Sequence, residues 1–138
     1  MEDNIQTGQK NWLYLMPAII WALILAFLML LPQESFPESK LLSYDKLAHI
    51  GVFALLSALL LFGGLKTKFL GKTKTSLLAR SLTISIVYST GLEFLQNFSP
   101  GRSTDLYDLI ANVVGAIFGV LVFYIFNKNK FAIYKLML

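Results

Sequence analysis

The sequence contains no cysteine, and only 14% of its 138 residues are charged. The absence of cysteine excludes a disulfide framework, a zinc–thiolate site, a cysteine nucleophile and a lipoprotein anchor. A soluble domain carries about 25% charged residues to cover its surface, so the low charge argues against a water-soluble enzyme. Hydrophobic residues make up 56% of the chain, which excludes disorder. A single domain of this composition is typical of an integral membrane protein.

Four apolar stretches are long enough to cross a bilayer, which requires about 17–25 residues. They are residues 13–31, 47–65, 77–98 and 109–126. Short loops between them favour antiparallel packing of sequence neighbours. We therefore predict an all-α polytopic membrane protein with a four-transmembrane-helix antiparallel bundle. Its parts are an N-terminus at 1–12, a membrane domain at 13–126 and a basic tail at 127–138.

Lysine and arginine are distributed unevenly between the loops. Nine lie on the side of the two termini and the 66–76 loop, and three lie on the other side. The positive-inside rule then places both termini in the cytoplasm and turns the 32–46 and 99–108 loops outward. We interpret the basic 66–76 loop as a topology signal that contacts anionic lipid headgroups, with no nucleic acid as partner.

Most of the other ionisable residues gather at the outward ends of the last three stretches. With their polar neighbours they are Asp45, Lys46, His49, Glu93, Gln96, Arg102, Asp105, Asp108 and Asn112. Asp45 and His49 are four residues apart and share a helix face. Glu93 lies inside an apolar stretch, where a carboxylate costs a few kcal/mol unless it faces a partner or a wet cavity. The sequence therefore predicts a polar site at the outer face of the membrane.

Two cations in this set favour an anionic ligand. Lys46 and Arg102 lie near the expected N-termini of the second and fourth helices, whose free backbone N–H groups attract phosphate or carboxylate. We therefore expect these two side chains to bind a ligand. Further candidate ligand-binding residues are Gln96, Asp105, Asp108 and Asn112.

The carboxylates nevertheless outnumber the cations by four to two, which requires a proton, a metal or a cationic ligand. Protonated carboxylates would permit acid–base catalysis, with His49 or Glu93 as the general acid or base and Asp45 orienting His49. A divalent metal is the other alternative, because a histidine with several carboxylates can hold Zn²⁺, Mn²⁺ or Mg²⁺. The sequence has no HExxH motif and identifies no particular cofactor.

Gly115 and Gly119 are one helical turn apart in the last stretch. This small-residue spacing permits close approach of a neighbouring helix, so we predict that they are packing residues.

Three segments together resemble the VanZ-like family of bacterial membrane proteins. They are residues 45–53 (DKLAHIGVF), residues 91–96 (GLEFLQ), and PGR at 100–102 followed by the aspartates, asparagine and glycine of 105–115. The family pattern is DKxxHF, then ExxQ, then PGR with DxxDxxxNxxG, and the resemblance covers roughly residues 10–126. Ile50 stands where an aromatic residue is commoner, and Val52 where the family often has tyrosine.

The resemblance implies a multi-pass protein of the bacterial cytoplasmic (inner) membrane. The family's namesake is associated with reduced susceptibility to teicoplanin-type glycopeptide antibiotics, which act on cell-wall precursors outside the membrane. That association agrees with a polar site on the outer face. The implied partners are the lipid bilayer and a lipid headgroup or cell-wall precursor.

Three functions stay open at this point. The protein is expected to bind or modify an envelope lipid or cell-wall precursor. It is alternatively an intramembrane hydrolase or transferase of an amphiphilic phosphate that uses Glu93 and His49. It is otherwise a structural bundle whose polar residues hold helices together. Secondary transport by so few helices would require a homo-oligomer.

Overall fold

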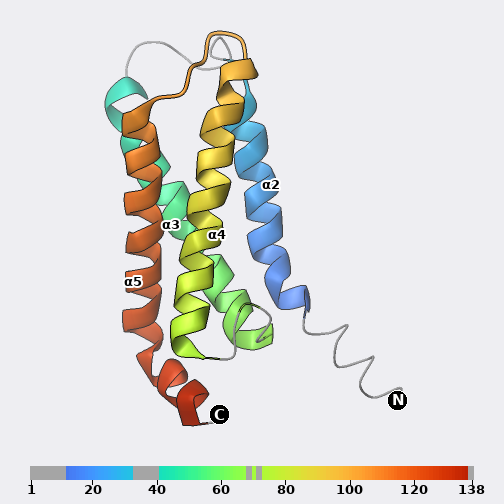
Figure 1. The fold of residues 1–138 in the computed structure, drawn as a ribbon, viewed down its shortest axis with the longest axis vertical. Coiled ribbons are helices and arrows are strands. Elements are labelled where there is room, and N and C mark those ends of the chain that lie inside the picture. The colour runs from blue at the N-terminus through green and yellow to red at the C-terminus, as the bar shows by residue number, and fades with distance from the viewer. Residues whose placement is uncertain (1–11, 33–40, 68–69, 71–72, 137–138) are drawn as a thin grey trace, which may run out of the picture.

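The computed structural model describes residues 12–32, 41–67, 70 and 73–136, and these are helical apart from short connections. The elements are η1 (Trp12–Leu15), α2 (Met16–Leu30), α3 (Leu41–Thr67), α4 (Lys74–Leu95), η3 (Gln96–Phe98) and α5 (Leu106–Leu136). The prediction of an all-α fold is confirmed. Figure 1 shows the four α-helices in one bundle, in which successive helices run in opposite directions and α3 crosses behind α4. We call the end where α2 and α4 finish and α3 and α5 begin the upper end, and the opposite one the lower end.

Three helical segments are long and apolar enough to cross a membrane. They are Trp12–Leu30, Asp45–Thr67 and Leu106–Asn129, and they correspond to three of the four predicted spans. The fourth predicted span corresponds to α4, which is less hydrophobic because it contains Lys74, Arg80, Glu93 and several serines and threonines. Length and hydropathy therefore identify three candidate spans among the four α-helices.

One face of α4 turns four polar residues to the interior of the bundle. Ser81, Ser85, Ser89 and Glu93 are buried, whereas large apolar side chains such as Val87 are exposed. A helix of a soluble protein shows the opposite pattern, with its apolar stripe turned to the core. The low hydropathy of α4 thus comes partly from the face that other helices cover and partly from exposed residues such as Arg80 and Thr83.

Helices α3 and α5 approach each other closely at two glycines. A Cβ atom added to Gly115 would lie 2.3 Å from the Ile50 carbonyl oxygen, and one added to Gly119 would lie 2.1 Å from that of Ala54. Only a residue without a side chain fits at such positions. Between the two glycines, the Ser57 hydroxyl donates to the Ala116 carbonyl oxygen over 2.9 Å. This contact aligns the beginnings of α3 and α5, which carry most of the polar residues.

Helix α2 is attached to the bundle by an apolar cluster and by two side-chain hydrogen bonds. The cluster contains Leu25, Met29, Phe53, Leu56 and Leu92. The Trp21 indole donates to the Val52 carbonyl oxygen over 2.9 Å, and the Tyr88 hydroxyl donates to that of Ala22. These bonds attach the middle of α2 to α3 and to α4.

Helix α5 changes direction near the lower end. Asn127 has non-helical backbone angles (φ −118°, ψ 17°), and its side-chain amide donates to the Phe123 carbonyl oxygen over 2.9 Å. The straight part of α5 therefore spans the bundle, and the part after Asn127 leaves the bundle axis (Figure 1).

Candidate functional site

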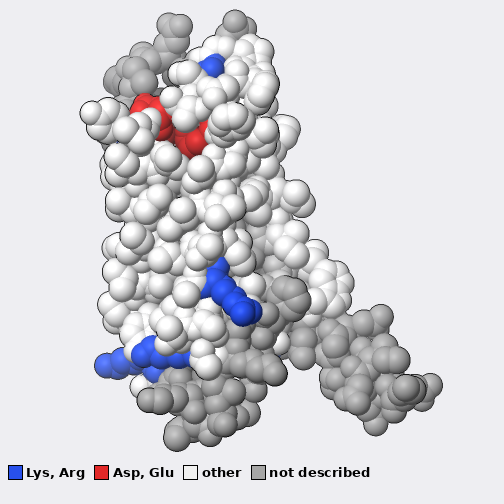
Figure 2. Space-filling view, in the orientation of Figure 1, with Lys and Arg blue, Asp and Glu red and all other residues white. Residues whose placement is uncertain are grey.

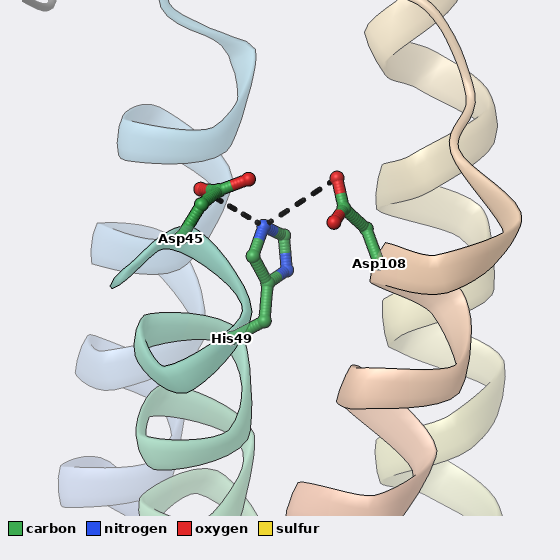
Figure 3. A group of neighbouring side chains, drawn as sticks. All are labelled: Asp45, His49 and Asp108. Atoms are coloured by element: carbon green, nitrogen blue, oxygen red, sulfur yellow. Dashed lines mark ion pairs between the residues drawn. The ribbon is translucent and has the colours of Figure 1, made fainter. Parts of the chain in front are cut away.

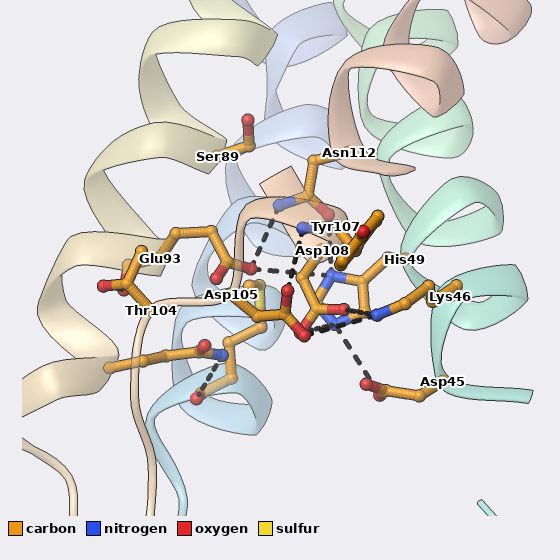
Figure 4. A network of polar contacts seen from close by, with 12 residues as sticks. Asp45, Lys46, His49, Ser89, Glu93, Thr104, Asp105, Tyr107, Asp108 and Asn112 are labelled. Carbon is orange, nitrogen blue, oxygen red and sulfur yellow. Dashed lines mark hydrogen bonds and ion pairs between the residues drawn. The ribbon is translucent and has the colours of Figure 1, made fainter. Parts of the chain in front are cut away.

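All nine predicted site residues lie at the upper end, but their side chains form two separate groups. The larger group, which we call the acidic cluster, joins α3, α4 and α5 (Figure 4). Its members are Asp45, Lys46, His49, Glu93, Asp105, Asp108 and Asn112. The smaller group contains Gln96 and Arg102 and contacts α2. In the face shown in Figure 2, acidic atoms gather only near the upper end, among the residues that the structure describes.

The cluster residues at the start of α5 lie at increasing depth in the bundle. Asp105 precedes α5 and acts as its N-cap, since its carboxylate accepts the Tyr107 backbone N–H over 2.8 Å. This hydrogen bond holds the pKa of the Asp105 carboxyl below its ordinary value. Asp108 and Asn112 follow on the same face, and they are buried. The cluster therefore runs from an exposed rim at Asp105 to a closed interior at Asn112.

Asn112 connects two helices in this interior. Its amide nitrogen donates to Glu93 Oε1 over 3.2 Å, and its amide oxygen lies 2.6 Å from His49 Nδ1. With the amide nitrogen turned to the carboxylate, the amide oxygen accepts a proton from Nδ1. Glu93 is 1% exposed and Asn112 is completely buried, so bulk water does not compete with this contact. The arrangement assigns the Nδ1–H form to the His49 ring.

The other ring nitrogen of His49 faces two carboxylates (Figure 3). His49 Nε2 lies 3.6 Å from Asp45 Oδ1 and 4.0 Å from Asp108 Oδ2. Both separations exceed a hydrogen bond. Ligand atoms of these three residues all lie within 4.8 Å of one another, and they are the group of described residues that can hold a metal ion.

Lys46 is the cation of the rim. Its Nζ lies 2.5 Å from Asp108 Oδ1 and 3.5 Å from Asp105 Oδ2, and 5.8 Å from the centre of the Tyr107 ring. Lys46 and Asp105 are each close to half-exposed. Lys46 thus neutralises the carboxylate of Asp108 strongly and that of Asp105 weakly. Among the described ion pairs, the other two carboxylates, those of Asp45 and Glu93, have only His49 as a partner.

Glu93 is the most deeply placed carboxylate. Its Oε1 lies 3.7 Å from His49 Nδ1, and its Oε2 has no hydrogen-bond donor among the described residues. Buried polar atoms without a partner are uncommon in folded proteins. The Thr104 hydroxyl donates to the backbone oxygen of Glu93 over 3.0 Å, which ties the loop before α5 to α4.

The second group covers the end of α2. Three successive carbonyl oxygens there, those of Met29, Leu30 and Leu31, accept hydrogen bonds from side chains after α4. The donors are Gln96 Nε2 at 3.1 Å, Ser99 Oγ at 2.9 Å and Arg102 Nε at 2.7 Å. The last carbonyls of a helix lack partners within the helix and carry its negative partial charge, so a guanidinium is well suited to them.

A tight turn brings these donors to α2. The Arg102 backbone N–H donates to the Ser99 carbonyl oxygen over 3.1 Å, and Gly101 between them has φ 75°. Proline followed by glycine is typical of a type II turn, because the third position requires a positive φ. The PGR segment therefore connects α4, α2 and α5 in the structure. Ser99 and Thr104, which the sequence analysis did not select, take part in the same connection, and their only signal in the sequence is their position beside this turn.

Two apolar cavities lie elsewhere in the bundle. One of about 290 Å³ lies between α2, α3 and α4, and one of about 240 Å³ lies between α3 and α5. Neither is lined by a residue of the acidic cluster.

A comparison with protein families gives one match. The sequence model of the family described as VanZ/LLP1 matches residues 6–127, a range that includes the whole acidic cluster and the PGR turn. No curated protein and no solved structure matches the chain.

Proposed function

This chain belongs to the VanZ/LLP1 family, and from that premise we propose that it is a multi-pass protein of the bacterial cytoplasmic membrane whose acidic cluster binds or modifies a lipid headgroup or cell-wall precursor. The observation that carries the proposal is a buried ionisable cluster, built by three helices, that opens among exposed apolar side chains.

The exposed surface of the bundle supports a membrane location for all four helices. Large apolar side chains of α2 and α5 are exposed, such as Phe27 at 67% and Phe126 at 83%. Helix α4 has the same property, with Val87 65% exposed, while Ser81, Ser85 and Ser89 are buried. Such a surface is stable against lipid tails and unstable in water. We therefore infer that α4 is the fourth span despite its lower hydropathy.

The charges support an outward position for the cluster. The lower end carries the basic residues Lys66, Lys74, Arg80 and Lys128, and the acidic cluster lies at the upper end. The side of a membrane protein that is rich in lysine and arginine stays in the cytoplasm. In this orientation the cluster faces the outer leaflet, where cell-wall precursors and glycopeptide antibiotics meet.

The rim of the cluster is suited to an amphiphile. Leu106 and Tyr107 are 65% and 68% exposed beside Asp105 and Asp108, and Phe98 is 78% exposed on the neighbouring loop. A headgroup at Lys46 would leave acyl chains in contact with these apolar side chains. The excess of carboxylates favours a headgroup that brings positive charge, either as an amine of its own or as a bound divalent ion.

An intramembrane hydrolase or transferase is the second candidate, and one contact favours it. Glu93 and His49 lie 3.7 Å apart inside the bundle. A carboxylate and an imidazole at this separation form an acid–base pair once a substrate brings them together. Substrate would have to displace the Lys46–Asp108 contact to reach the pair.

The test is the thermal stability of the detergent-purified protein with undecaprenyl phosphate, a lipid II analogue or teicoplanin. A ligand that binds only the folded state raises the melting temperature. At a ligand concentration one hundred times its dissociation constant, the free energy of unfolding rises by about 2.7 kcal/mol. We expect a shift for the wild-type protein that is lost in Asp108→Asn. Ser85→Ala, a change at another buried polar residue of α4, is the control and should keep the shift.

The variant Glu93→Gln separates the candidate functions, because it keeps the size and hydrogen bonding of the side chain. A binder keeps its ligand shift and its effect on teicoplanin tolerance in cells. An enzyme keeps the shift and loses product formation. If no ligand shifts the wild-type protein, and Glu93→Gln changes neither melting temperature nor tolerance, the polar residues serve only to hold helices together.

A further inference from the structure

The acidic cluster has more negative charge than its own cations neutralise. Four carboxylates, those of Asp45, Glu93, Asp105 and Asp108, meet one ammonium group, so the formal charge is −3 with His49 neutral. We propose that Asp45, His49 and Asp108 hold a divalent transition-metal ion, Zn²⁺ or Mn²⁺, at the upper end of the bundle. This inference does not depend on the proposed ligand, since the ion binds to the protein alone.

The spacing of the three side chains fits one ion. Two donors on opposite sides of an ion with bonds of about 2.1 Å are separated by about 4.2 Å. His49 Nε2 lies 3.6 Å from the Asp45 oxygen and 4.0 Å from the Asp108 oxygen, and all three ligand atoms are within 4.8 Å of one another. A tetrahedral ion with bonds of about 2.1 Å needs donors about 3.4 Å apart, so side-chain rotations have to bring these ligand atoms closer together before all three bind.

The neutral His49 ring carries its lone pair on the nitrogen that faces the two aspartates. Because Nδ1–H is directed to the Asn112 oxygen 2.6 Å away, the lone pair of the neutral ring is on Nε2, between Asp45 and Asp108 (Figure 3). Metal-bound histidines commonly donate their other ring N–H to an oxygen atom that sets the orientation of the ring. Asn112 therefore acts as a positioning residue for His49.

Glu93 supplies an independent indication of a cation. Its carboxylate is 1% exposed, points toward His49 in Figure 4, and has one oxygen without a donor among the described residues. An uncompensated carboxylate in an interior of low dielectric constant is costly. A cation bound on the Nε2 side of the imidazole would reduce this cost by electrostatic attraction.

The donor set determines the class of the ion. An imidazole nitrogen favours Zn²⁺ or Mn²⁺ over Mg²⁺ and Ca²⁺, which prefer oxygen donors alone. Lys46 contacts Asp108 through Oδ1, and the facing atom Oδ2 is the one near His49, so lysine and metal use different oxygens. Three protein donors leave a coordination position open at the rim for water or an external ligand.

The experiment uses the full chain, purified in detergent and treated with a chelator. Zn²⁺, Mn²⁺ and Mg²⁺ are titrated separately, with bound metal measured by equilibrium dialysis and melting temperature measured in parallel. We expect one Zn²⁺ or Mn²⁺ per chain and a rise in melting temperature. Asp45→Asn is the main variant because Asp45 is 46% exposed, so it folds without its carboxylate. It should lose affinity by about a hundredfold or more, and His49→Gln should lose at least as much.

Asp105→Asn is the matched control for charge. It removes the same charge from the same cluster, but the Asp105 carboxylate bonds to Lys46 and to the Tyr107 N–H and is no ligand in the proposal. We expect its affinity to change by less than about threefold, which separates ligation from general electrostatic attraction. Asn112→Leu removes the acceptor of Nδ1–H and should weaken binding about 10–100-fold.

Three results would overturn the proposal. The first is that the wild-type protein shows no saturable binding of Zn²⁺ or Mn²⁺ at millimolar concentration. The second is that Asp45→Asn and Asp105→Asn weaken metal binding equally. Binding of Mg²⁺ with the same affinity as Mn²⁺ would exclude the imidazole as a ligand. If His49→Gln does not fold, Asp45→Asn and Asp105→Asn alone still decide between the outcomes.

Discussion

The two ends of the bundle differ in the contacts that their charged side chains make. At the upper end, the ion pairs that described residues form with one another all fall within a single cluster of three helices. At the lower end, Lys66 and Lys74 contact the tyrosine rings of Tyr14 and Tyr124, with 5.9 and 4.3 Å between the ammonium nitrogen and the ring centre. Figure 2 shows the same contrast on one face, with compact acidic atoms above and separate basic side chains below.

Under the proposed function, this difference separates a binding site at the upper end from a lipid-facing surface at the lower end. At the lower end Lys66, Arg80 and Lys128 are exposed and Lys74 is half-buried against Tyr124, and the ion pairs between described residues include none of these four. Charges at the upper end share partners, so a change in one alters the others. Tyrosine and lysine together are typical of membrane interfaces, where a ring lies among headgroups and an amine reaches water. Chemistry is therefore expected at the upper end and lipid contact at the lower end.

The largest expected effect concerns which end faces outward. Because the chain has no cysteine, a single introduced one reports its own side. Ser103 and Thr75 are exposed residues of the upper and lower ends, respectively. In intact cells, a membrane-impermeant maleimide should label Ser103→Cys and should label Thr75→Cys only after permeabilisation. The reverse pattern would contradict the orientation derived from the charges.

The second prediction concerns the contact that holds α3 and α5 together below the cluster. In Gly115→Ala the new Cβ atom would lie 2.3 Å from the Ile50 carbonyl oxygen, so the two helices must separate. We expect a loss of about 1–3 kcal/mol of unfolding free energy or more. Gly91→Ala is the control, since no atom lies within 4 Å of its added Cβ. Unfolding by a denaturing detergent measures both, and equal stability of the two variants would contradict the close contact.

The third prediction compares one lysine from each end. Lys46→Met removes the cation that lies 2.5 Å from Asp108, whose side chain is only 12% exposed, and should cost about 1–2 kcal/mol. Lys74→Met removes a ring contact and the hydrogen bond that its ammonium group donates to the Tyr124 hydroxyl, and should cost about 1 kcal/mol or less. Melting temperatures of the two variants give the comparison. A larger loss for Lys74→Met would mean that the lower end, and not the cluster, contains the coupled charges.

The smallest expected effect concerns acid. The folded-state pKa of Asp105 is lowered by the Tyr107 backbone N–H, so its carboxylate stabilises the fold above the ordinary pKa of about 4. This contribution is lost as the pH falls through the folded-state pKa. Since the Asp105 side chain is 44% exposed, the effect is less than about 1 kcal/mol.

Asp105→Asn provides the reference for this effect, because asparagine is an equally good N-cap that does not titrate. The melting temperature of the wild-type protein should exceed that of the variant at pH 6 and approach it at pH 3. A constant difference between the two across this range would show that the Tyr107 N–H does not favour the charged form.

Much of the upper end was predictable from spacing. Asp45 and His49 were expected on one face because they are four residues apart, and the structure places the two side chains 3.6 Å apart. The gathering of residues from three helices at one end was predictable because short loops force neighbouring helices to be antiparallel. The prediction of helices throughout is confirmed, and three of the four expected spans agree with length and hydropathy.

The positions of Gln96 and Arg102 were not predictable in the same way. Arg102 was expected to bind an anion beside Lys46, and in the structure its Nε donates to the Leu31 carbonyl oxygen at the end of α2. Spacing along one helix does not reveal which neighbouring helix end a side chain in a loop will reach. That choice depends on the Pro100–Gly101 turn and on where α2 ends, which are tertiary features.

The sequence by itself determined the class of the protein, the helices, the uneven distribution of charge and the set of residues at the upper end. These properties are local, since they follow from hydropathy, spacing and loop length. The tertiary structure alone decided which of those residues meet: that His49 lies between Asp45 and Asp108, that Asn112 joins it to Glu93, and that Gln96 and Arg102 cover α2. The reason is that hydrogen bonds and ion pairs depend on distances of a few ångströms between helices, and these distances are set by how the helices pack against one another and not by any one segment.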